Sequence, residues 1–347
     1  MLLEGVYIPL TTPFYPDGKL NLRKLEHNVD RYSRTPGAGI AVLSSIGEPE
    51  TLSDLETREA LQAALGAASE TKVMIAGISR GSVATALDLV EFAATTGYDA
   101  VLVKRPASLR EGQLRETVTF FQAVADRSSV PVILDSVPLA SLELEAVAEL
   151  SSHANVIGLF DGEGSVERIG HIRAATSTVK RETTVTTVFA AVTRRMLAVK
   201  EQVGAATFVT AESLGGGAAV ATAPPRPAIR TRTKAVGFQV IAASSSGMLA
   251  GLRAGATGVM PAFAAAAPQA AYEVYAAWKD DDQPLAEEKQ LRIAPAIAKV
   301  EVELGVPGIR YASDLNGYFG GRPRLPLLPL TGPERAVVEQ WMGGIRN

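Results

Sequence analysis

Eight short apolar runs alternate with longer amphipathic stretches along nearly the whole chain, and this alternation most constrains its fold. The runs are almost continuously hydrophobic, which is typical of parallel strands buried on both faces. Helical patterns follow them, so helices are expected to cover the strands. The expected strands are Val6–Leu10, Gly39–Ser44, Lys72–Ala76, Ala100–Lys104, Pro131–Asp135, Asn155–Phe160, Phe238–Ala242 and Gly258–Pro261.

Eight strand–helix units close most naturally into a (β/α)8 barrel, whose usual size is about 250 residues. Ser53 and Ser82 precede two of the helical stretches and are placed to cap them. An open doubly wound sheet is the alternative, but no Gly-x-Gly-x-x-Gly follows any expected strand. The clearest helical stretches are Asp54–Ser69, Val83–Thr96, Gly112–Arg127 and Glu143–Ser152.

Two regions lie outside the eight units. Residues 284–347 carry further helical patterns and are expected to form a C-terminal helical extension of a barrel that spans residues 1–283. Residues 181–236 are an insertion between the sixth helix and the seventh strand. The insertion contains a β-branched run, a helical pattern and a basic stretch, and it is a surface insertion, a lid or a subunit contact.

Composition narrows the function classes. Of the 347 residues 20% are charged, and the net charge of −3 arises from interspersed acids and bases. Neither nucleic acid nor a membrane is therefore an expected partner. The chain has no cysteine, which excludes disulfides and thiolate chemistry and fits a reducing cytoplasm. The first residues contain no basic region and run directly into a strand, so no signal peptide is expected.

Several segments at the strand ends and in the loops are informative through their order and spacing. These segments are Ile8–Phe14, Ser44–Glu48 with Thr51–Ser53, Gly97–Ala100, Val132–Leu134, Val156–Leu159 and Gly320–Leu330. Together they resemble the dihydrodipicolinate synthase / N-acetylneuraminate lyase family, across nearly the whole chain except the insertion.

The resemblance implies a (β/α)8 barrel that assembles as a homodimer or homotetramer and uses neither a metal nor an organic cofactor. It implies aldol addition or cleavage through a lysine imine of pyruvate, in which the protonated imine accepts the electron pair of the carbanion. A tyrosine relays protons, and backbone N–H groups with hydroxyls hold the substrate carboxylate.

Several positions depart from that pattern. Phe160 stands where the family has its imine-forming lysine, and Asp135 stands where it has the relay tyrosine. Ser45 keeps one hydroxyl of the carboxylate-binding loop. The remaining departures are Ile46 in that loop, Ala107 and Ser108 in place of a tyrosine pair, Ala140 in place of an arginine, and Ser244–Ser246 in place of an acidic pair.

Lys104 is the candidate replacement nucleophile, because it ends the fourth strand and the carboxyl ends of barrel strands face the active site. Strand alternation lets only one of Lys104 and Arg105 point inward. The alternative to a nucleophile is a structural role, in which Lys104 or Arg105 forms an ion pair with Asp135 or Asp161, or simply points to solvent. Asp135 with Asp161 or Glu48 is a candidate carboxylate pair or metal site, although Glu48 is more typical of a structural hydrogen-bonding residue.

The three histidines, His27, His153 and His171, fall in helices or at helix ends and argue against a metal site. Phe160 is expected to fill the space of the missing lysine and to make the pocket smaller and drier.

Three hypotheses follow. The first is a divergent lyase-type enzyme on a small 2-oxo or hydroxy acid, with Asp135 as the acid–base group and Lys104 as the cation. The second is a catalytically inactive barrel that binds a metabolite or a partner subunit. The third is a standard lyase that uses another lysine, such as Lys180 or Lys200. The substrate-binding residues predicted for the first hypothesis are Ser44, Ser45, Arg105, Ser108 and Asp161.

Overall fold

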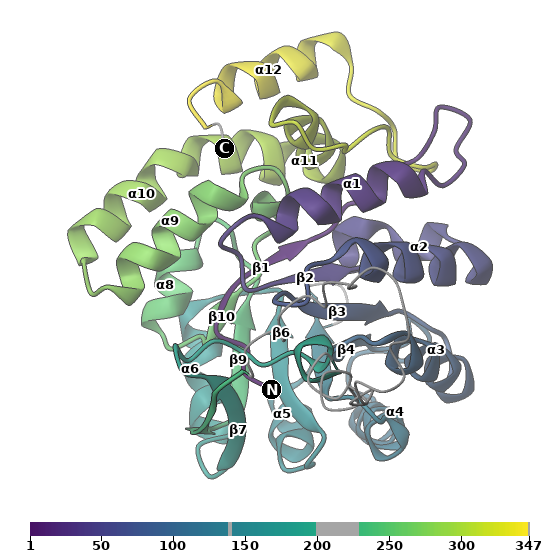
Figure 1. Ribbon diagram of the computed structural model, residues 1–347, viewed down its shortest axis with the longest axis vertical. Helices are drawn as coiled ribbons and strands as arrows, with labels where there is room; N and C mark the ends of the chain where they lie inside the picture. Colours follow the sequence, from purple (N-terminus) through teal and green to yellow (C-terminus); the bar gives the residue numbers. More distant parts are fainter. Residues whose placement is uncertain (138–140, 199–228, 346–347) are drawn as a thin grey trace, which may run out of the picture.

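The computed structural model contains a closed barrel of eight parallel strands ringed by helices (Figure 1). It describes residues 1–137, 141–198 and 229–345. The register Gly5↔Gly258 closes the barrel between its first and last strands, so the barrel prediction is confirmed and the open-sheet alternative is wrong. In barrel order the strands are β1 (Gly5–Pro9), β10 (Gly258–Val259), β9 (Gln239–Ala242), β6 (Val156–Asp161), β5 (Val132–Ser136), β4 (Ala100–Lys104), β3 (Val73–Ile78) and β2 (Gly39–Val42).

Two of the covering helices begin at the caps that the sequence predicts. The Ser53 side chain accepts the backbone N–H of Glu56 in a capping box, and the Ser82 side chain accepts that of Thr85. The helices are α1 (Leu22–Ser33), α2 (Asp54–Ala67), α3 (Val83–Thr96), α4 (Leu114–Arg127), α5 (Leu144–Ser151), α6 (Val166–Ala175), α8 (Met248–Arg253) and α9 (Pro268–Lys279).

Strand alternation divides the core into two clusters. One fills the barrel interior and includes Tyr7, Leu102 and Ile133, whereas the other lies between the strands and the helices. On β4 and β5 the interior series continues two residues beyond Leu102 and Ile133, to Lys104 and Asp135. The alternation therefore places these two side chains inward at the carboxyl end of the barrel, which we call the mouth.

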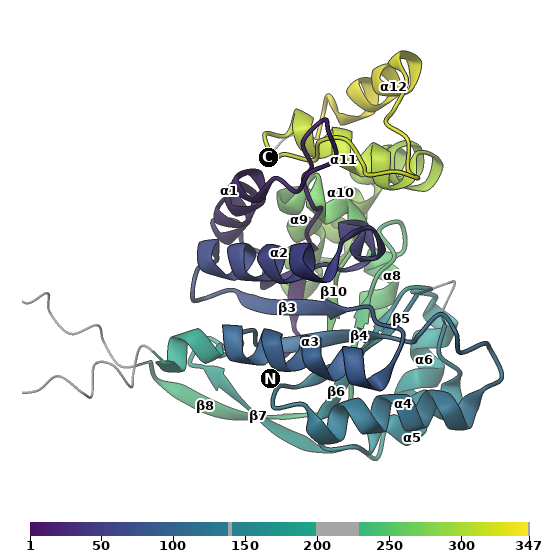
Figure 2. The same cartoon turned by 90° about the vertical axis from the view of Figure 1, so that its right-hand side faces the viewer.

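The described part of the insertion lies at the other end of the barrel. Its strands β7 (Arg181–Thr186) and β8 (Thr231–Val236) pair as an antiparallel ribbon (Figure 2). The Arg181 guanidinium donates to the backbone carbonyls of Ser151 and His153, which precede β6. The backbone N–H of Arg194 donates to Asp99, which precedes β4. These described residues therefore do not form a lid over the mouth. The strand β8 lies partly in the basic stretch of the insertion, for which the sequence predicts no strand.

The C-terminal extension packs beside α1 and α9 (Figure 1). It contains α10 (Gln283–Ala296), a π-helix η6 (Ile297–Glu303), α11 (Gly305–Leu315) and α12 (Gly332–Met342). Helical patterns at Leu285–Leu304 and Gly332–Met342 of the sequence predict α10 with η6 as one helix, and α12, but not α11.

A buried ion pair joins the extension to the barrel. The Arg310 side chain on α11 is completely buried, and its Nε donates to Glu48 Oε1 at 2.6 Å. Its Nη2 donates to the Thr12 carbonyl at 2.8 Å. Glu48 Oε2 accepts the backbone N–H of Arg324 at 3.1 Å. Glu48 thus has a structural role, as the sequence favoured, and is committed to Arg310 rather than to Asp135.

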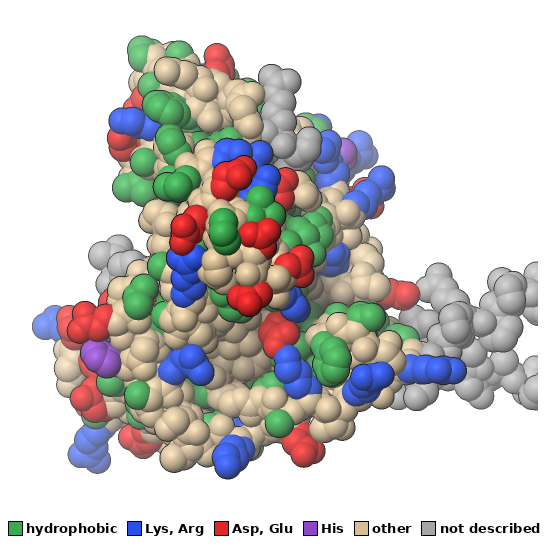
Figure 3. All heavy atoms as spheres, turned by 90° about the vertical axis from the view of Figure 1, so that its left-hand side faces the viewer, with side chains coloured by type: hydrophobic (Ala, Val, Ile, Leu, Met, Phe, Trp, Pro, Cys, Tyr) green, Lys and Arg blue, Asp and Glu red, His purple; other side chains and the backbone are tan. Residues whose placement is uncertain are grey.

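On the face shown in Figure 3, positive and negative side chains are interspersed, as the composition predicted. Across the described ranges, no helix combines the length and the apolar character needed to cross a membrane.

Replacing Arg310 with methionine should lower the free energy of unfolding by about 3–5 kcal/mol, because the Glu48 carboxylate would remain buried without its counter-charge. Urea unfolding of both proteins measures the difference. The control is Arg335→Met at the exposed Arg335 on α12, expected to change stability by about 0.5 kcal/mol or less. Equal effects of the two substitutions would contradict the structural role of the pair.

Candidate functional site

Two cavities open at the mouth of the barrel. The first, the mouth cavity, has a volume of about 320 Å³. The second, the side cavity, has a volume of about 470 Å³ and lies over the ends of β2, β3 and β4. The mouth cavity is lined by Pro9, Ser44, Ser45, Ile46, Val137, Phe160, Gly162, Glu163, Ala243, Ser244, Ser245, Ser246, Met260, Ala262, Glu301 and Val302. The side cavity is lined by Pro49, Glu50, Leu52, Ser79, Arg80, Gly81, Lys104, Arg105, Pro106, Ala107 and Leu109.

The loop after β2 brings Ser44 and Ser45 to the mouth cavity. Leu43 has the left-handed φ of 59° that non-glycine residues rarely adopt. Its carbonyl lies so close to Gly77 that a Cβ at that position would overlap it, so the neighbouring strand must offer a glycine here. Ser44 is only 4% exposed, and its hydroxyl has no hydrogen-bond partner. The loop therefore presents an unused buried hydroxyl at the cavity.

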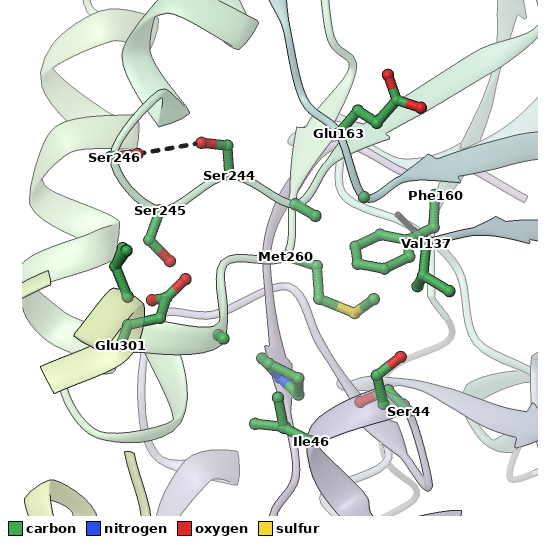
Figure 4. A pocket seen from close by; sticks show the side chains of 16 residues that line it. Ser44, Ile46, Val137, Phe160, Glu163, Ser244, Ser245, Ser246, Met260 and Glu301 are labelled. Carbon is green, nitrogen blue, oxygen red and sulfur yellow. Dashed lines mark hydrogen bonds between the residues drawn. The ribbon is translucent and has the colours of Figure 1, made fainter. Parts of the chain in front are cut away.

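Phe160 forms the apolar wall of the mouth cavity. Its ring lies beside Val137 and Met260 and is 8% exposed (Figure 4). The described lining of this cavity contains no lysine, so the lysine absent from position 160 has no substitute there. An imine of the family type cannot form at this position.

Asp135 lies between the two cavities and lines neither. Its backbone is in register with Lys104 of β4 on one side and Phe160 of β6 on the other. The carboxyl group is buried, and its Oδ1 has no hydrogen-bond partner. Burial raises the pKa of Asp135 to about 7; the positive charge of Lys104 opposes this shift and the negative charge of Glu50 adds to it. This carboxyl can therefore gain or lose a proton near neutral pH.

Lys104 pairs with an acid that sequence reasoning did not select. Its Nζ donates to Glu50 Oε1 at 2.7 Å, rather than to Asp135 or Asp161. Burial would raise the pKa of Glu50, but the hydrogen bond and charge of Lys104 outweigh it and hold that pKa below its usual range. Lys104 is thus a cation at the side cavity.

Arg105 also lines the side cavity and carries unused donors. It is 6% exposed, yet its Nε and Nη1 have no hydrogen-bond partner. Arg80 lines the same cavity and pairs with Asp54 at 3.0 Å. Three cations therefore line the side cavity against one lining acid, Glu50, which favours an anionic ligand.

Two predicted substrate-binding residues lie elsewhere. Ser108 is exposed and lines a separate hollow beside α3 and α4, because the chain turns outward after Pro106. Asp161 is completely buried and lines neither cavity. It pairs with Arg168 at 2.8 Å and accepts the backbone N–H of Gly164, so it stabilises the loop before α6. With Glu48 committed to Arg310, neither acid pairs with Asp135.

The alternative lysines and the metal hypothesis gain no support. Lys180 directly precedes β7, at the end of the barrel opposite the mouth, whereas Lys200 and Ala140 fall outside the described residues. His153 hydrogen-bonds Asp126, and His27 packs against Phe319. The parts of the chain that the structure describes contain no cluster of three or more potential metal ligands.

Glu301 reaches the mouth cavity from η6 and was missed by sequence reasoning. Figure 4 shows its carboxylate facing Ser245 across one side of the cavity. Burial raises the pKa of Glu301, although hydrogen bonds with the Ser245 side chain and the Phe263 backbone oppose the shift. Its Oε2 has no hydrogen-bond partner. The one local signal was Pro295, which interrupts the helical pattern shortly before this residue.

Comparison with known sequences gives consistent matches. The model of the dihydrodipicolinate synthetase family matches residues 2–212. A 4-hydroxy-tetrahydrodipicolinate synthase of Methanothrix thermoacetophila is 25% identical over 340 residues, which cover 97% of this chain and 95% of that protein. A protein of the same name from Xanthomonas campestris is 33% identical over 180 residues, or 51% of this chain and 59% of that protein.

Solved structures share the fold. A dihydrodipicolinate synthase from Bacillus anthracis superimposes with a TM-score of 0.77 at 20% identity, and the match covers 100% of both chains. A chloride-inhibited dihydrodipicolinate synthase from Acinetobacter baumannii, solved with pyruvate, gives a TM-score of 0.76 at 20% identity over 99% of both chains.

The pKa of Asp135 predicts a pH-dependent stability. The pKa of Asp135 is higher in the folded protein than in the unfolded chain. Its protonated carboxyl therefore stabilises the fold fully below the unfolded-state pKa, and this contribution is lost as the pH rises through about 7. Between pH 5 and pH 8 the unaltered protein should lose roughly 2–3 kcal/mol relative to Asp135→Asn. Urea unfolding at both pH values measures this. Asp280→Asn, at an exposed aspartate, should show no such difference; parallel pH profiles for wild type and Asp135→Asn would contradict the prediction.

Proposed function

We propose, from the premise that this chain belongs to the dihydrodipicolinate synthetase family, that it is a lyase-type enzyme that acts on a small 2-oxo or hydroxy acid without a lysine imine. In this proposal Asp135 is the acid–base group. Lys104 and Arg105 bind the acid in the side cavity. Ser44 and Ser45 do not bind the acid in this proposal, because they line the mouth cavity, whose acidic lining is unfavourable for a carboxylate.

The observation that carries the proposal is the buried Asp135 carboxyl next to Lys104. A buried carboxyl oxygen without a hydrogen bond costs stability, and no described residue donates a hydrogen bond to Oδ1 of Asp135. Its pKa of about 7 suits a group that both accepts and donates protons at neutral pH. Strained and perturbed acids of this kind concentrate at functional sites.

The charges of the side cavity support an acid as the substrate. A carboxylate would supply an acceptor for the unpartnered Nε or Nη1 of Arg105, in a charge-assisted hydrogen bond. With a 2-oxo acid, Asp135 would then remove a proton from C3, the carbon next to the oxo carbon, because only a carbonyl oxygen can accept the electron pair left behind. The electron pair left behind would delocalise toward the oxygen, where the Lys104 ammonium would stabilise the negative charge.

A non-catalytic binding barrel is the second candidate. It is favoured by Phe160, which occupies the mouth in place of the nucleophile, and by the direct bond of Lys104 to Glu50. In this case the side cavity would bind the same acid without turning it over.

Turnover of a panel of 2-oxo and 2-hydroxy acids, followed by NMR, tests the proposal. Asp135→Asn should lower kcat by about 10²–10⁴-fold with little change in KM, because it removes the proton-transfer group. Arg105→Met should raise KM by about tenfold or more, because it removes a charge-assisted contact to the acid.

The control for the arginine is Arg110→Met, at an exposed side chain of the same loop, which should change neither constant. Saturable, Arg105-dependent binding without turnover of any acid would support the binding barrel instead. Absence of both binding and turnover would contradict both candidates.

Borohydride trapping with pyruvate tests the chemistry directly. The unaltered protein should form no adduct, whereas Phe160→Lys should form one at position 160, because a desolvated amine at the cavity can attack the ketone. Intact mass and peptide mapping identify the site. Val302→Lys, at the exposed rim of the same cavity, should form none because its amine stays solvated and protonated. An adduct at Lys104 of the unaltered protein would overturn the imine-free mechanism.

A further inference from the structure

The mouth cavity differs in charge from the side cavity. Its lining contains two acids, Glu163 and Glu301, and no lysine, arginine or histidine among the described residues. Glu163 is partly neutralised, since it accepts the Ser141 hydroxyl at 2.6 Å and lies 3.9 Å from Arg168. Glu301 has no ion pair with a described residue, so it is the main charge that a ligand in this cavity would meet.

Two polar groups in the lining lack partners. One is Oε2 of Glu301, and the other is the hydroxyl of Ser44, whose side chain is more than nine-tenths buried. Buried polar groups are nearly always hydrogen-bonded, so two unsatisfied groups around one cavity indicate a polar ligand. The Glu301 oxygen needs a donor, whereas the Ser44 hydroxyl can donate or accept. Ser44 lies on the opposite side of the cavity from Glu301 (Figure 4).

The remaining wall is apolar. Phe160, Met260 and Val137 line one side together, and Ile46 lies below them (Figure 4). An aromatic face attracts an organic cation, and aliphatic side chains favour an alkyl stem. A simple metal cation does not use such a wall, whereas an alkylammonium ion uses both the wall and the carboxylate.

The position of Glu301 is set by unusual backbone. It lies in the π-helix η6, a conformation that is rare and frequently found at functional sites. Pro295 precedes η6 and lacks a backbone donor. Burial raises the pKa of Glu301, and a bound cation would favour its ionised form.

We propose that the mouth cavity is a binding site for a small protonated primary amine with a short alkyl stem, with Glu301 as its counter-charge. The ammonium group donates hydrogen bonds, one of which the free Oε2 of Glu301 can accept. The site is independent of the acid proposed for the side cavity.

Three probes of equal length test the proposal on the unaltered protein: n-butylamine, 1-butanol and butanoate. At pH 7 the amine is protonated, so the probes differ in charge but little in size. Ligand-observed NMR titration and thermal shift should show saturable binding that is at least about tenfold tighter for the amine than for the alcohol, and the amine should not compete with butanoate, which the side cavity can bind. Equal or tighter binding of the alcohol, no saturable binding of the amine, or competition between the amine and butanoate would overturn the proposal.

Glu301→Gln retains the side-chain shape and should weaken amine binding by at least about tenfold. The matched control is Glu303→Gln, since Glu303 lies on the same π-helix, is exposed, pairs with Lys299 and is outside the cavity lining. Equal amine affinity in the two variants would also overturn the proposal. The three-probe comparison uses the unaltered protein, so it tests the amine site even if Glu301→Gln fails to fold.

Discussion

The buried pair of Arg310 with Glu48 is the interaction on which the arrangement of the mouth depends. Its two members come from α11 and from the loop after β2, and Arg310 also binds the Thr12 carbonyl. Removing both charges from water is costly, and the cost is offset only if the partners are held in good hydrogen-bonding geometry. The pair therefore fixes the C-terminal extension against the barrel, and with it the approach of Glu301 to the mouth cavity.

Phe160 and Asp135 divide the mouth of the barrel. They stand next to each other on β6 and β5. On one side of them the cavity is lined by acids and hydroxyls, and on the other by Arg80, Lys104 and Arg105. The mouth of this barrel therefore offers two surfaces of opposite charge, separated by one aromatic ring and one buried carboxyl.

Sequence reasoning located all eight strands and the barrel, because buried strands require apolar runs whose period is visible locally. It also identified Asp135, Lys104 and Arg105 at the mouth, since strand ends determine which residues meet there. It missed Glu301 and the Glu50 partner of Lys104, because their positions depend on packing between segments far apart in the chain. Asp161 lies outside both cavities because it directly follows Phe160, whose side chain points into the barrel, so strand alternation turns the Asp161 side chain away from the interior.

The ribbon of β7 and β8 also affects how this chain tolerates change. Its two strands leave and re-enter the barrel side by side, from Arg181 paired with Val236 to Thr186 paired with Thr231. The entropy of bringing the ends of the insertion together is thus offset by the ribbon's own hydrogen bonds, together with those of Arg181 and Arg194 to the barrel. Changes along the ribbon therefore act at the end of the barrel opposite the mouth, away from the two cavities.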